Sequence, residues 1–157
     1  MCNACHRSDD VAALEASLHA GIDPNTVDTN GATPNAGYKT APLLFIAAGE
    51  NHVGTVAALL AAGADVDKAK TTTGATPLFV AVELGHLPVV ERLIAAGADV
   101  DKARTDGGFT PLYMAAEKGH LPVVERLIAA GADVDKAQTT DGTTPLFIAA
   151  SAGPPPA

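Results

Sequence analysis

The sequence lacks tryptophan and is poor in aromatic residues, in cysteine and in positive charge. Aromatic residues make up 4% of the 157 residues, cysteine occurs twice, and 10 Lys and Arg stand against 18 Asp and Glu. With 47% hydrophobic residues, mostly Ala, Val, Leu and Ile, the chain has enough apolar surface to form a core and should not be disordered. Small apolar side chains with few large anchors favour close packing of helices. Cys2 and Cys5 are too near each other in the sequence to staple a fold.

The shortage of positive charge excludes some classes of partner. The formal net charge is -8, and nucleic acid and anionic membrane surfaces both repel such a chain, so we expect neither as a partner. No apolar run approaches the length of a membrane span, and residues 1–10 lack the apolar region of a signal peptide. These absences predict a soluble intracellular protein, cytoplasmic or nuclear.

What the sequence does contain is a repeat with a period of 34 residues. Residues Gly85–Ala103 recur unchanged as Gly119–Ala137. A fixed period of this length is typical of stacked supersecondary units, each of which contacts only its neighbours. A column of alanines shares the same spacing: Ala47, Ala81, Ala115 and Ala149.

The repeat Lys70–Ala103 predicts two short helices and an extended finger. Thr76, followed by proline, is expected to cap the first helix, which Gly85 ends in a left-handed conformation. Pro88 opens the second helix, Gly97 stops it, and A-D-V-D-K-A then runs toward the next unit. Each helix is shorter than about 12 residues, so its stability must come from stacking. Small residues between the first helices and larger ones between the second helices predict a curved stack, with the turns and first helices on the concave side.

These motifs resemble those of the ankyrin repeat. The family pattern T-P-L-H-x-A is matched at Thr76–Ala81, Thr110–Ala115 and Thr144–Ala149, and the later G-H…G-A-D-V hallmark at Gly85–Asp101 and Gly119–Asp135. The resemblance implies an all-α fold, an ankyrin-repeat solenoid of stacked helix-turn-helix units joined by β-turn/hairpin fingers. The chain departs from the family in three ways: Phe or Tyr replaces the motif's His, Asp stands where Asn is usual in the later hallmark, and each unit carries one extra residue, which we expect in the turn segment.

The register divides residues 1–157 into parts of a single ankyrin-repeat domain. An insertion separates the first two units, and its Gly, Pro and Asn predict a surface loop. We favour a tolerated insertion over a partner-contacting finger that carries Tyr38 and Lys39. The parts are a partial repeat at 1–30, the insertion loop at 29–41, repeats at 42–69, 70–103 and 104–137, a partial repeat at 138–153 and a Pro-rich end at 154–157.

Both end repeats are half units, which leaves apolar residues without a following layer. Leu146 and Ile148 are expected to have one uncovered side. The chain is therefore interpreted either as a piece of a longer array or as a protein whose ends pack on something, for which weak self-association is the simplest case.

The motif C-N-A-C-H at Cys2–His6 has the spacing of a haem attachment site, so a haem or metal protein using Cys2, Cys5 and His6 is one alternative. No export signal precedes the motif, and no second Cys/His pair completes a zinc site. In the repeat register both cysteines fall in apolar columns, so we interpret them as buried thiols and expect no cofactor.

The recurring polar residues do not form a catalytic set. His52, His86 and His120 come from successive units, which are too far apart to share one metal ion. We expect these histidines to hydrogen-bond backbone between units. The paired aspartates of the fingers, from Asp65 to Asp135, are interpreted as a solvated edge. The catalytic motifs that we sought are absent, so the protein is not expected to be an enzyme.

Four of the six aromatic residues occupy one column of the repeat. A fifth, Phe109, lies in a turn. We favour packing of the column between units over an apolar strip along the groove. Phe109, in the turn itself, is the best candidate for a partner anchor because exposed aromatic residues often dominate interfaces. The column consists of Phe45, Phe79, Tyr113 and Phe147.

The resemblance implies a protein-interaction module whose rigid concave groove binds a protein or peptide. A regulatory segment of a larger enzyme or array is a second alternative, beside the haem or metal protein. In the family, the turn tips and the last turn of the first helix carry the binding residues. Position by position, this nominates Thr72, Ala75, Glu83, Leu84, Asp106, Phe109, Glu117, Lys118 and Thr143.

Overall fold

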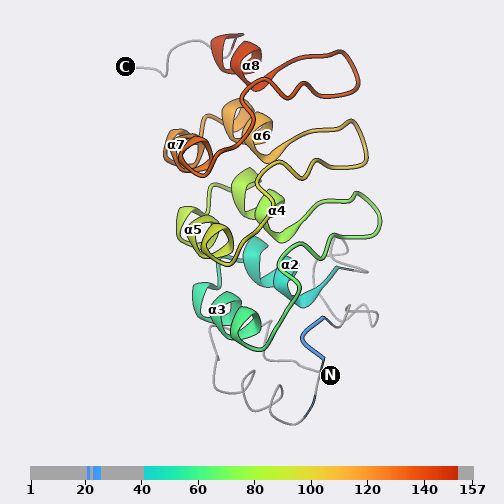
Figure 1. The fold of residues 1–157 in the computed structure, drawn as a ribbon, viewed down its shortest axis with the longest axis vertical. Coiled ribbons are helices and arrows are strands. Elements are labelled where there is room, and N and C mark those ends of the chain that lie inside the picture. The colour runs from blue at the N-terminus through green and yellow to red at the C-terminus, as the bar shows by residue number, and fades with distance from the viewer. Residues whose placement is uncertain (1–20, 22, 26–40, 152–157) are drawn as a thin grey trace.

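The computed structural model describes residues 21, 23–25 and 41–151, and these residues fold into a stack of short α-helices without a β-strand (Figure 1). The predicted all-α repeat solenoid is therefore confirmed. The described helices are α2 (Leu43–Gly49), α3 (Val53–Ala61), α4 (Pro77–Glu83), α5 (Leu87–Ala95), α6 (Pro111–Lys118), α7 (Leu121–Ala129) and α8 (Pro145–Ser151).

The helices form two rows. In Figure 1 the inner row (α2, α4, α6 and α8) stands in one column, the outer row (α3, α5 and α7) in a second, and the connecting loops project to the opposite side of the inner row. We call these loops, residues 62–76, 96–110 and 130–144, the fingers. Successive inner helices contact each other more extensively than successive outer helices do. Closer packing in the inner row than in the outer row is the difference from which the sequence analysis predicted a curved stack.

Side-chain caps and prolines set the starts of α4 and α6, as predicted, whereas α2 follows Pro42 without a side-chain cap. The Thr76 hydroxyl accepts a hydrogen bond from the Phe79 amide at 3.1 Å, and Thr110 accepts one from Tyr113 at the same distance. Gly85 follows α4 with a φ of +73°, the left-handed conformation expected after a helix. The outer helix α5 begins one residue earlier than predicted, so that its proline occupies the second helical position.

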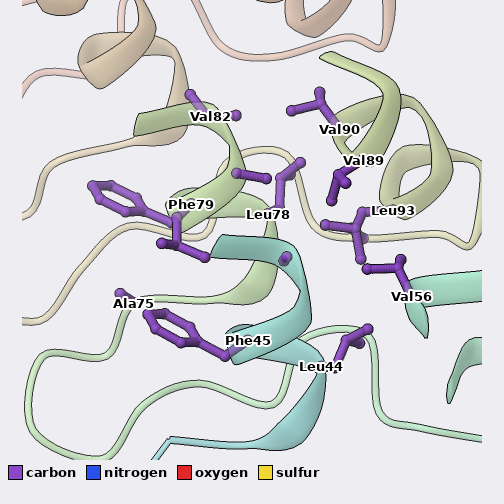
Figure 2. Packing of buried hydrophobic residues seen from close by; sticks show 14 of the residues in the cluster. Leu44, Phe45, Val56, Ala75, Leu78, Phe79, Val82, Val89, Val90 and Leu93 are labelled. Carbon is purple, nitrogen blue, oxygen red and sulfur yellow. The ribbon is translucent and has the colours of Figure 1, made fainter. Parts of the chain in front are cut away.

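Neighbouring helices share one continuous apolar core. Figure 2 shows Leu78 of α4 pointing toward Val89 and Leu93 of α5, whereas Phe45 and Phe79 lie on the side of the inner helices away from α5. Leu78, Val89 and Leu93 are all 0% exposed. Burial of each such side chain is worth about 1.5–3 kcal/mol, and short helices like these depend on it.

The fingers are joined to one another by backbone hydrogen bonds. The Thr105 amide donates to the Thr73 carbonyl at 3.0 Å, and the Thr139 amide donates to the Gly107 carbonyl at 2.9 Å. The next finger approaches so closely that a Cβ on Gly74, whose φ is +67°, would lie 2.6 Å from Thr105 Cγ2. Gly74 therefore supplies both an unusual conformation and the space for stacking.

The aspartates of the fingers connect successive repeats, which the sequence interpretation as a solvated edge had missed. The Asp99 amide donates to the carboxylate of Asp67, one repeat earlier, at 3.2 Å. The Asp133 amide donates in the same way to Asp101 at 2.9 Å. The row is solvent-accessible, as expected, but its carboxylates also satisfy backbone donors that the finger leaves without a helical partner.

The repeated histidines were predicted to hydrogen-bond backbone groups between units, and two of the three do so. His86 Nε2 lies 3.0 Å from the Gly49 carbonyl oxygen, and His120 Nε2 lies 3.2 Å from the Glu83 carbonyl oxygen. His52 has a buried Nδ1 without a hydrogen-bond partner among the described residues. The residues that the register aligns before His52 lie outside the described part of the chain.

Helix α8 packs on α6 but exposes two large apolar side chains. Leu146 is 70% exposed, as expected from the sequence, and Phe147 is 65% exposed. Ile148 is half-buried, so only part of the expected exposure applies to it. Within the described residues, no helix has the length and apolar character needed to cross a membrane.

Candidate binding surface

The nominated residues fall into three classes of accessibility. Five side chains are exposed, three are partly buried, and one lies in the core. We call the eight accessible residues the finger-side face, because they lie on the finger turns and on the last turns of the inner helices. The face consists of the exposed Thr72, Leu84, Asp106, Glu117 and Lys118 and the partly buried Glu83, Phe109 and Thr143.

Ala75 was nominated for partner contact, but its position in the core corrects that interpretation. It is 6% exposed and packs within the apolar cluster that includes Phe45 and Phe79. Figure 2 places Ala75 beside Phe45 of the preceding inner helix. A side chain with so little accessible surface can contribute to a partner site only by supporting its neighbours.

Phe109 is not the exposed anchor that the sequence suggested. Its ring packs on Tyr113, with 5.3 Å between ring centroids and 51° between ring planes. Gly107 permits this arrangement: it has a φ of +96°, and a Cβ there would lie 2.5 Å from Phe109 Cε2. The turn therefore folds the aromatic side chain back onto α6, leaving it partly buried against the core.

The aromatic column packs between repeats, as the favoured interpretation predicted, except at its last member. Phe45, Phe79 and Tyr113 are 5%, 1% and 6% exposed, so these three do not form an apolar strip on the surface. Phe147, in the last described helix, differs because it is 65% exposed.

Arg104 is a further candidate site residue, which the sequence analysis did not identify. Its guanidinium forms an ion pair with Asp106, with Nε 2.7 Å from Oδ1, and lies over the ring of Phe79 with Cζ 5.4 Å from the centroid. The hydrogen bond to Asp106 raises the pKa of Arg104, and nearby Glu83 adds to that rise. The same hydrogen bond lowers the pKa of Asp106. A finger residue thus connects to the inner helix of the preceding repeat.

The following repeat has a different polar arrangement at the equivalent place. The register puts Gln138 where Arg104 stands, and the Gln138 side-chain amide donates to Asp141. The Thr143 hydroxyl and amide also donate to Asp141, and the hydroxyl contributes most to lowering the pKa of that carboxyl. Burial raises the pKa of Tyr113, and the carboxylates of Glu117 and Asp141 raise it further.

The finger-side face can make polar and apolar contacts, but its described groups do not form a metal site. Among the described ranges, no three His, Cys, Asp or Glu side chains are grouped so that they could hold an ion. Cys2, Cys5 and His6, and likewise Tyr38, Lys39 and the insertion loop, lie outside the described residues. What the face offers is an exposed leucine beside acidic and basic side chains on a stacked scaffold.

Comparison with protein families agrees with the architecture. The model for ankyrin repeats (3 copies) matches residues 1–104, and the model for ankyrin repeats (many copies) matches residues 112–157. The comparison with curated proteins gives no match. Ankyrin repeats are in general protein-interaction modules. The stacked helix pairs, the fingers and these matches together show that the chain belongs to the ankyrin-repeat family.

Proposed function

We propose that the finger-side face binds a protein or peptide and that the protein works by display rather than by catalysis. The observation that carries the proposal is a contrast between repeats: their buried columns are nearly the same, whereas the finger-side positions vary. Leu84, directly after α4, corresponds to Lys118 on α6, and Phe109 in one finger corresponds to Thr143 in the next, whereas Glu83 recurs as Glu117. A constant framework with variable exposed positions is an arrangement suited to selecting a partner.

The framework supports recognition because it is ordered before binding. The hydrogen bonds between fingers and the contacts between inner helices fix the finger turns relative to α4 and α6. A preorganised surface loses less conformational entropy on association than a mobile loop does. The net charge of -8 favours a partner segment with positive charge, chiefly through faster encounter.

Affinity capture from a cell lysate with identification by mass spectrometry tests this proposal. The finger-side variant combines Leu84→Glu with Lys118→Glu. The matched control combines Arg92→Glu with Ala95→Glu on the exposed side of α5, which gives the same change in charge. We expect the finger-side variant to lose a partner that the wild type and the control retain. Loss from the control with retention by the finger-side variant would place binding on the outer helices and contradict the proposal.

A further inference from the structure

The stack has a second accessible apolar surface, at its α7–α8 end and apart from the finger-side face. We call Leu121, Ile128 and Leu146 the end surface; their side chains are 63%, 48% and 70% exposed. Leu121 and Ile128 stand seven residues apart on α7, so they share one side of that helix. Exposed apolar groups of this size point to a binding surface, because a repeat whose outer side faces water normally carries polar residues there.

Earlier repeats show what covers the side chain equivalent to Leu146. Leu78 of α4 is 0% exposed and points toward Val89 and Leu93 of α5 (Figure 2). Leu112 of α6 is 2% exposed, and α6 packs on α7 in the same way. The leucine in both repeats is therefore buried against the outer helix of its own repeat, whereas no outer helix of the α8 repeat is among the described elements.

The exposed side of α7 corresponds to the side of α5 that is partly covered. Leu87 and Ile94 of α5 are partly buried and pack against the core, and α5 contacts α7. Leu121 and Ile128 occupy the same positions of α7 and are exposed. A helix placed against α7 and α8 as α7 is placed against α5 and α6 would therefore contact all three residues of the end surface.

The loop before the outer helix differs between repeats in the same way. A Cβ on Gly85 would lie 2.9 Å from Cε1 of His120, which directly precedes α7. At the equivalent Gly119, no described atom lies within 4 Å of such a Cβ. The accessible area thus extends from the end surface to the loop where a covering helix would begin.

The outer helices of this chain define which kind of helix fits such a surface. In α5, Val89, Val90 and Leu93 are buried and Ile94 is partly buried, so aliphatic residues stand at positions i, i+1, i+4 and i+5. Helix α7 has the same sequence, and α3 keeps the pattern with threonine in the first position. The opposite side of α5 is polar and exposed, as at Glu91. Each outer helix is therefore a short amphipathic helix with one aliphatic side.

We infer that the end surface binds an amphipathic helix of a partner polypeptide, seated against α8 and α7 as α7 is seated against α6 and α5. Its aliphatic residues stand at i, i+1, i+4 and i+5, and those at i and i+4 pack on Leu146. The inference is continuous with the helix contacts of the stack, in which this leucine column receives such a helix in earlier repeats. A second copy of the chain fits less well, because Val89 and Leu93 of its α5 are already 0% exposed. The site does not depend on the finger-side face.

A constrained peptide copied from α5 tests the end surface without the natural partner. The peptide has the sequence of Gly85–Ala98 with Ala95→Lys, and a lactam joins this lysine to Glu91, one turn earlier on the exposed side. The lactam is needed because so short a helix is unstable in water. A control peptide with the same lactam carries Val89→Ser and Leu93→Ser, which removes the two residues that pack on the leucine.

NMR of the methyl-labelled full chain follows Leu146 and Ile128 during the titration. We expect saturable shifts with the aliphatic peptide at concentrations up to about 1 mM and none with the control peptide. Leu146→Glu places a charge on the end surface and should weaken binding by about tenfold or more, with Ile128 as the reporter. Ala95→Glu in the protein adds the same charge on the exposed side of α5 and should leave binding unchanged.

Three results would overturn the inference: no saturable shift, equal shifts with both peptides, or equal weakening by Leu146→Glu and Ala95→Glu. Sedimentation velocity of the chain without peptide should show a monomer. Self-association that Leu146→Glu abolishes would assign the end surface to a second copy and would also overturn the partner helix. If Leu146→Glu does not fold, Ile128→Glu replaces it, because this side chain is also exposed, and Leu146 then serves as the reporter.

Discussion

Helices α4 and α8 start from almost the same sequence and end in different surroundings. Both begin with Pro-Leu-Phe after a threonine. Leu78 is 0% exposed and Phe79 is 1% exposed in α4, whereas the equivalent Leu146 and Phe147 of α8 are 70% and 65% exposed. The local sequence therefore determines that a helix forms, and the neighbouring repeats determine what it buries.

The difference arises from the number of layers around each helix. Helix α4 contacts α2 before it, α6 after it and α5 beside it, while α8 has extensive contact only with α6 among the described helices. Because each layer stabilises the next, equivalent substitutions should have very different effects at the two places. The following comparisons test that expectation, beginning with the largest effect.

The leucine column should show the largest contrast. Leu78→Ala removes a fully buried side chain and leaves a cavity, so it should lower the free energy of unfolding by about 2–5 kcal/mol. Leu146→Ala acts on an exposed residue and should change it by less than about 0.5 kcal/mol. Equilibrium unfolding in urea measures both values. Similar losses at the two positions would mean that α8 is covered in solution.

The alanine column should show a smaller contrast of the same kind. Ala115 is 0% exposed between inner helices, and Ala115→Leu should overpack that contact and destabilise the protein by about 1–3 kcal/mol. Ala149, in the same column of α8, is exposed, and Ala149→Leu should be nearly neutral. Thermal unfolding followed by circular dichroism compares them. A neutral Ala115→Leu variant would contradict the assignment of this column to the contact between inner helices.

The helix caps should show the smallest contrast. The buried Thr110 hydroxyl accepts from the Tyr113 amide at 3.1 Å, and the more accessible Thr144 hydroxyl accepts from Phe147 at 3.3 Å. Thr110→Ala should cost about 1–2 kcal/mol, and Thr144→Ala about 0.5 kcal/mol, because water can replace the lost acceptor there. Urea unfolding gives both differences, and a larger loss at Thr144 would contradict the ordering.

Most of the fold could be predicted because its signals are local. Thr-Pro pairs mark the starts of α4 and α6, and Gly85 and Gly97 follow α4 and α5 with positive φ, as expected. The period then specifies which residues meet between layers, so the burial of the alanine and aromatic columns followed from the sequence for every member except those of α8, Phe147 and Ala149, which are exposed. The first residue of α5 differed from the expectation, because its proline occupies the second helical position.

The candidate site was harder to predict because its contacts depend on the conformation of the turns. Gly107 has a positive φ that folds Phe109 onto Tyr113, and no local pattern specified that direction. The placement of Arg104 over Phe79 requires the finger to cross back over the preceding inner helix. The sequence period could have placed Asp67 and Asp99 near each other in successive fingers. The hydrogen bond between the Asp99 amide and the Asp67 carboxylate, however, depends on the geometry of the fingers.

Insertion of one additional layer tests the stacking of equivalent units most directly. A second copy of residues 104–137 placed after Ala137 creates a natural junction, because Gly119–Ala137 repeats Gly85–Ala103. If each layer is stabilised by its neighbours, the extended chain should gain helical signal in proportion to its length and unfold at a higher urea concentration than the original. An extended chain that unfolds at the same or a lower concentration would contradict the account.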